Sequence, residues 1–116
     1  MNPKHVSSKN LLPQPKITPS HGNVLKYPEV TGGTAEIIFP SYPGITLGQE
    51  VSWGIRGNGI AFASFKILEL KPQYEVKVRF HIVFDAEQVT ADYSVRENDE
   101  VIGVSHQSVY TVIDRP

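Results

Sequence analysis

Four histidines are the residues of this 116-residue chain best suited to metal binding or proton transfer: His5, His21, His81 and His106. None has a second potential ligand two positions away on a predicted strand or four positions away on a helix, where neighbouring ligands share a metal ion. His81 alternates with apolar residues, so its alternative role is a solvent-facing position on a strand. We therefore expect no metal site and no cofactor.

Nucleophilic catalysis is the second chemistry to consider. The chain has no cysteine and no Gly-x-Ser-x-Gly elbow. Ser105 and His106 are adjacent, but neighbours on a strand point to opposite faces. The acidic stretch RENDE (96–100) would bind calcium only if a second loop added oxygens, and a solvated hairpin end is the alternative. We expect no enzymatic activity, with a small hydrolase as the least favoured class.

Exposed loops supply the candidate binding residues. Arg56 and Asn58 lie in GIRGNG, which lacks the lysine and the following helix of a phosphate loop. Tyr42 in SYPG and Tyr74 before a long apolar stretch could form an aromatic platform for a sugar ring. The alternative for each tyrosine is an anchor at a sheet edge with its hydroxyl in water.

Strands must position these loops, because apolar residues recur at every second position. Val51, Trp53 and Ile55 share one face, and the same alternation continues through residues 74–84 and 89–95. The predicted core positions are Trp53, Val76, Val78, Phe80, Ile82, Phe84, Tyr93 and Val95.

The architecture that follows is all-β. No stretch has apolar residues at helical spacing with caps, and Gly/Pro turns separate six or seven short strands. Asn98-Asp99 is typical of a tight hairpin turn, because both residues tolerate positive φ. We predict an antiparallel sandwich of about seven strands over residues 23–116.

Residues 1–22 are predicted to be a flexible, basic tail. They contain four prolines, and a proline-rich groove ligand is the alternative to a plain linker. Residues 1–28 carry a charge of +4 and residues 29–116 carry −5. The net charge of −1 gives no reason to expect nucleic acid as a partner, and no apolar run is long enough to span a membrane. Without a Sec-type signal, a complete chain is expected in the cytoplasm or exported by a signal-independent route.

A family resemblance rests on the order of several short motifs. YPG, LGQEVSW, ADYSV and VIGVS, closed by VYTVID, resemble the immunoglobulin-like repeat modules of proteobacterial surface and secreted proteins. Gln49 stands where that pattern has an acid. The resemblance covers roughly residues 23–114 and implies an immunoglobulin-like sandwich with a non-catalytic adhesive or spacer role.

The function expected from the sequence is therefore a non-catalytic binding or spacer module for adhesion, toxin accessory roles or protein interaction. The alternative is a small carbohydrate-binding sandwich that uses the tyrosines with Arg56 and Asn58. A protein or a glycan is the expected partner. Self-association through an edge strand or the N-terminal arm is a further possibility, since unpaired strand edges invite strand addition.

Overall fold

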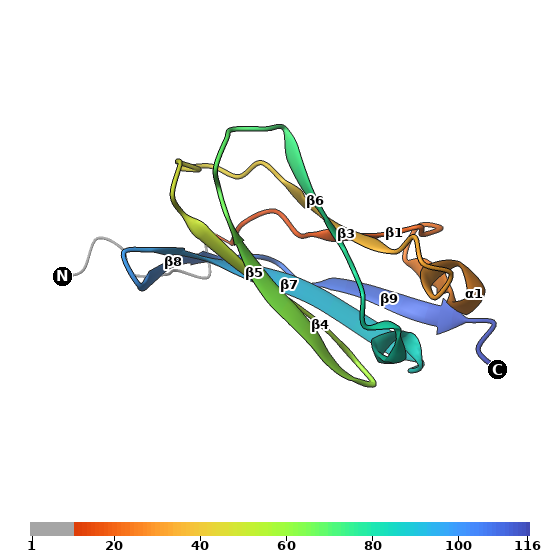
Figure 1. Ribbon diagram of the computed structural model, residues 1–116. Coiled ribbons are helices and arrows are strands. Elements are labelled where there is room, and N and C mark those ends of the chain that lie inside the picture. Colours follow the sequence, from red (N-terminus) through yellow and green to blue (C-terminus); the bar gives the residue numbers. More distant parts are fainter. Residues whose placement is uncertain (1–10) are drawn as a thin grey trace.

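The computed structural model describes residues 11–116 and shows two β-sheets packed as a sandwich (Figure 1). Within this range the smaller sheet has the order β1-β3-β6, and the larger has β2-β9-β7-β4-β5, with β8 also beside β7. The elements are β1 (Lys16–Thr18), β2 (Val24–Lys26), α1 (Tyr27–Val30), β3 (Glu36–Pro40), β4 (Glu50–Gly57), β5 (Gly59–Lys66), β6 (Gln73–Lys77), the 3-10 helix η2 (His81–Phe84), β7 (Gln88–Glu97), β8 (Glu100–Val104) and β9 (Ser108–Ile113).

The all-β prediction is confirmed, since both helical elements of the described chain are only four residues long. The two central strands of the larger sheet, β4 and β7, alternate between buried and more exposed positions until their last two residues. The Asn98-Asp99 hairpin is also confirmed, with φ values of 52° and 63°. Nine strands are present in residues 11–116, more than the seven expected, because β1 and β2 are too short to leave a periodic pattern. No helix in this range has the length and apolarity needed to cross a membrane.

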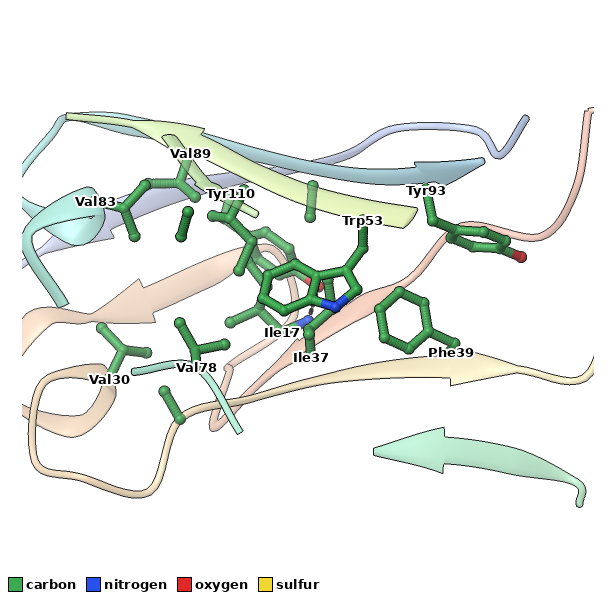
Figure 2. Packing of buried hydrophobic residues seen from close by; sticks show 14 of the residues in the cluster. Ile17, Val30, Ile37, Phe39, Trp53, Val78, Val83, Val89, Tyr93 and Tyr110 are labelled. Carbon is green, nitrogen blue, oxygen red and sulfur yellow. Dashed lines mark hydrogen bonds between the residues drawn. The ribbon is translucent and has the colours of Figure 1, made fainter. Parts of the chain in front are cut away.

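The core lies between the sheets and is centred on Trp53. Figure 2 shows its indole projecting from β4 toward Ile17, Ile37 and Phe39, all of which are buried. The Phe39 and Trp53 ring centres are 6.4 Å apart. The predicted core positions Trp53 and Tyr93 are therefore confirmed, as are Val51, Ile55 and Val95.

The tail prediction is wrong for residues 11–22, because part of this segment belongs to the sandwich. Lys16–Thr18 forms β1 against β3, and Ile17 is fully buried. The Ile17 amide donates a hydrogen bond to the Tyr110 hydroxyl (3.0 Å), drawn as a dashed line in Figure 2. The sequence did not predict this strand, because three residues between two prolines are too few to show a period-2 pattern. The remainder of the predicted tail, with His5, lies outside the described residues.

The long strand predicted over residues 74–84 is also shorter than expected. Its partner β3 begins at Glu36, which pairs with Lys77, so only one further bond follows, from the Val78 amide to the Ala35 carbonyl (2.9 Å). The chain then turns into η2. Val78 and Phe84 are buried, and Val76 packs against the core. The predicted core positions Phe80 and Ile82 are wrong, with 66% and 68% of their surface exposed.

Candidate functional site

The edge strand β5 is the most accessible pairing surface of the larger sheet. It pairs with β4 over its whole length, from Gly57↔Gly59 to Glu50↔Lys66, without a bulge. On its other side β5 has no strand neighbour in the described chain. Backbone N–H and C=O groups along that side are therefore free to bond an added strand, which is the property that makes edge strands sticky.

β5 lacks the features that usually protect an edge. Its eight residues, GIAFASFK, contain no proline, and its one charge is the terminal Lys66. Among the other edges, β1 and β2 have three residues each, and β6 carries Glu75 and Lys77. Short length and charge are the common protections against strand addition. A fifth strand, β8, pairs only with β7, has five residues and carries Glu100. Of these five outer strands, β5 is the longest and the one without either protection.

Two large apolar side chains project from β5 into solvent. Phe62 is 73% exposed and Ile60 is 56% exposed, whereas Ala61 on the opposite face is buried. Phe62 lies opposite Gly54 of β4. Because glycine has no side chain, the residue directly opposite on β4 does not cover the phenyl ring. The outer face of β5 is thus apolar and accessible.

A hollow of about 580 Å³ adjoins this strand on the outer face of the larger sheet. Short residues of the central strands line it, including Ser52, Gly54 and Ser94, and Phe62 of β5 and Val104 of β8 also line it. Arg56 and Asp92 add one positive and one negative group to the lining. The hollow lies over β4, on the side of β5 away from an added strand, so it can accept only side chains long enough to reach across β5.

Of the four predicted binding residues, Arg56 and Asn58 lie at the accessible surface. Both are exposed, near the tip of the β4–β5 hairpin, and Arg56 lines the hollow. The Asn58 amide donates a hydrogen bond to the Val83 carbonyl (3.0 Å), which attaches the hairpin tip to η2. Asn58 thus has a structural role through its backbone, and its side chain remains at the surface.

Tyr42 is buried, so its predicted place in an exposed aromatic platform is wrong. Its hydroxyl donates to Gln49 Oε1 (2.7 Å), and Gln49 Nε2 donates to the Gly44 carbonyl and to Glu97 Oε1 (3.2 Å each). Burial, and secondarily the nearby Tyr74 and Glu97, raise the pKa of Tyr42 to about 12. This polar cluster holds the 42–49 loop in place.

Tyr74 is also buried, and its predicted sugar-platform role is wrong for the same reason. Its hydroxyl donates to the Glu69 carbonyl (2.9 Å) and accepts from the Lys71 amide (3.0 Å). Its ring packs 5.9 Å from that of Phe65. Tyr74 therefore fixes the loop between β5 and β6, and its hydroxyl is already engaged with backbone groups.

The described histidines lie apart from one another. His21 Nε2 is 2.8 Å from Glu29 Oε1 at the surface, whereas His81 belongs to η2 and His106 follows β8. In residues 11–116 no three His, Cys, Asp or Glu side chains come together as a potential metal site. Within RENDE, Glu97 accepts the bond from Gln49, so this carboxylate has a structural partner.

The residues missed by sequence reasoning are Ile60 and Phe62. Both faces of GIAFASF are apolar, so the alternation does not show which face is turned outward. The sequence does contain one indication of an unprotected edge strand. Residues 57–65 carry no charge, which is unusual for an exposed strand.

Comparisons of this chain with protein-family models, with curated proteins and with solved structures find no match, so the open β5 edge and its hollow must be interpreted on their own geometry.

Proposed function

We propose that this protein is a non-catalytic binding module that captures an extended segment of a protein partner by strand addition to β5. The observation that carries the proposal is the combination, on one eight-residue edge, of unpaired backbone groups, exposed Phe62 and Ile60, and the adjoining hollow. In strand addition, main-chain hydrogen bonds supply affinity and pockets for alternate side chains supply specificity.

The energetic case rests on apolar surface that folding leaves in water. Burying a phenylalanine side chain is worth about 2 kcal/mol, and the isoleucine adds a similar amount. A partner strand beside β5 would cover one flank of each side chain, which gains part of this energy, while satisfying the edge backbone groups. The serines that line the hollow offer hydroxyls to polar side chains of the same partner.

We further propose that the sandwich is of the immunoglobulin type and that the chain is related to the proteobacterial repeat modules. Two packed sheets around a buried tryptophan in a domain of roughly 100 residues support this assignment. The adhesive or spacer role implied by that resemblance agrees with a surface built for partner strands.

The glycan-binding alternative has weaker support. It depended on Tyr42 and Tyr74, whose rings are in the core and whose hydroxyls are bonded to protein groups. An aromatic ring would have to come from Phe62, whose side chain has no polar group to orient a sugar. The exposed apolar edge fits a protein strand better.

The direct test uses a synthetic peptide with the sequence of residues 59–66 as the partner strand. Titrated into the isotope-labelled full chain, it should shift the amide NMR signals of β5 and of the hollow, while those of β1 and β6 stay unchanged. Two control peptides carry N-methyl groups, one at the positions of residues 60, 62 and 64 and the other at those of residues 61, 63 and 65. Only one edge of an added strand faces the protein, so only one control should lose binding. Equal loss in both, or shifts centred away from β5, would contradict strand addition.

A further inference from the structure

We propose that the partner strand is β5 of a second copy of this chain, which pairs antiparallel about a two-fold axis at Phe62. This inference rests on the proposed strand-addition function and names the partner of the same edge. Isologous contacts of this kind, in which one patch meets itself, are the commonest way for identical chains to associate.

Geometry limits the ways in which two β5 strands can meet. Directly opposed residues of an antiparallel pair lie on the same face of the sheet. Side chains alternate between faces, so the outward set of Ile60, Phe62, Ser64 and Lys66 must oppose itself. A two-fold axis between the strands therefore passes beside one residue that faces its own copy.

Phe62 is the residue that gives the best pairing. With the axis there, residues 59–65 of both copies overlap, Ile60 opposes Ser64 of the second copy, and Ala61 opposes Ala63. An axis at Ala63 gives the same overlap but places Lys66 opposite Ile60 of the second copy. An axis at Ala61 reduces the overlap within β5 to residues 59–63.

The Phe62 arrangement also suits the surrounding side chains. The two phenyl rings meet between Gly54 of one copy and Gly54 of the other, where no side chain competes for space. An aromatic cross-strand pair is among the more favourable pairs in sheets. The one charged residue of β5, Lys66, lies outside the overlap and opposite Asn58 of the second copy, so no like charges are opposed.

The first experiment measures the mass of the full chain by sedimentation over a range of concentrations. The native chain should approach twice its 12.9 kDa mass as concentration rises. In Phe62→Lys the ammonium groups of the two copies face each other across the axis. Because like charges repel, dimerisation should weaken at least about thirtyfold. Phe80→Lys is the matched control, since Phe80 is similarly exposed but lies outside β5, between β6 and η2, and it should dimerise like the native chain.

Single-cysteine variants then test the register, because the natural chain has no cysteine. Phe62→Cys should form a disulfide with its own copy, as opposed residues lie within disulfide range. Ile60→Cys mixed with Ser64→Cys should cross-link as a heterodimer. Neither should cross-link alone, because each residue is about 13 Å along the strand from its own copy.

The outcomes separate this inference from the proposed function. A chain that stays monomeric at every concentration overturns the dimer, yet strand addition stands if the residue 59–66 peptide still binds β5. A dimer that Phe62→Lys leaves intact, or in which Phe62→Cys fails to cross-link, places the contact elsewhere and also overturns the inference. Failure of both the dimer and the peptide removes the proposed function as well.

Discussion

The two long sides of the larger sheet differ in how they end. On one side the N-terminal segment pairs with β9 and bonds to the end of β8 at Val104. Leu12 bridges Ser105 in parallel orientation, and β2 pairs with β9. On the other side β5 has no strand neighbour in the described chain, and η2 contacts it near the hairpin tip. The protein thus uses its own chain to close one edge and leaves the other available, which is a meaningful difference because open edges carry a risk of aggregation.

Side chains of the larger sheet hold the covering segment in place. The Tyr93 hydroxyl donates to the Pro13 carbonyl (2.7 Å), and the Ser108 hydroxyl donates to the Pro15 carbonyl. Leu12 packs onto Gly103, where a Cβ atom would come within 2.8 Å of Leu12 Cδ1. A side chain at position 103 would therefore force the Leu12 side chain to move. Several side chains hold the N-terminal segment against the covered edge. The open edge, by contrast, lacks the prolines and charges that would discourage an added strand.

The largest effect is expected from removing the core that both sides share. Trp53→Ala should lower the free energy of unfolding by about 3–5 kcal/mol, measured by urea denaturation, because a large buried ring is lost. Trp53→Phe should cost less, since Trp53 Nε1 is buried without a hydrogen-bond partner in the described chain and its removal leaves no polar group unpaired. Native fluorescence emission like that of free tryptophan would contradict the buried position.

A matched pair of isoleucines compares the two sides directly. Ile17→Ala, in the covering segment, should lower the free energy of unfolding by about 3 kcal/mol because Ile17 is fully buried. Ile60→Ala, on the open edge, should change it by no more than about 0.5 kcal/mol. Measurements on dilute protein are needed, so that self-association does not contribute. Equal losses would mean that the Ile60 side chain is buried and that the outer face of β5 is not accessible.

Alkaline pH should weaken the covered side selectively. Burial, and secondarily the nearby Tyr42, raise the pKa of Tyr93 above its ordinary value of 10. A raised pKa in the folded state means that the stabilisation is complete below pH 10 and is lost as pH rises above it. Amide exchange of β8 should therefore increase above pH 10 more than that of β5, after correction for intrinsic rates. Tyr93→Phe should cost about 1 kcal/mol at neutral pH and reduce this dependence.

The smallest effect is expected at the hairpin tip. Arg56→Ala should change the free energy of unfolding by no more than about 0.5 kcal/mol, because its exposed side chain has no ion pair among the described contacts. It should nevertheless alter binding of the residue 59–66 peptide, since Arg56 lines the hollow. Unchanged affinity would limit the binding surface to β5 itself.

The sequence by itself determined the central strands and their inward faces. Val51, Trp53, Ile55, Tyr93 and Val95 were predictable because period-2 alternation is a local property of a half-buried strand. The Asn98-Asp99 turn was predictable for a similar reason, since positive φ depends on residue type at those two positions.

Only the tertiary structure decided where the alternation stops and which edges are open. Phe80 and Ile82 continue the pattern of residues 74–78, but β3 is too short to pair with them. Ile17 is buried because distant Tyr93, Ser108 and Tyr110 bond to its segment. Phe62 is exposed because it lies on the outer face of β5, which the rest of the described chain leaves largely uncovered. Packing between distant segments sets all three, and no local pattern contains it.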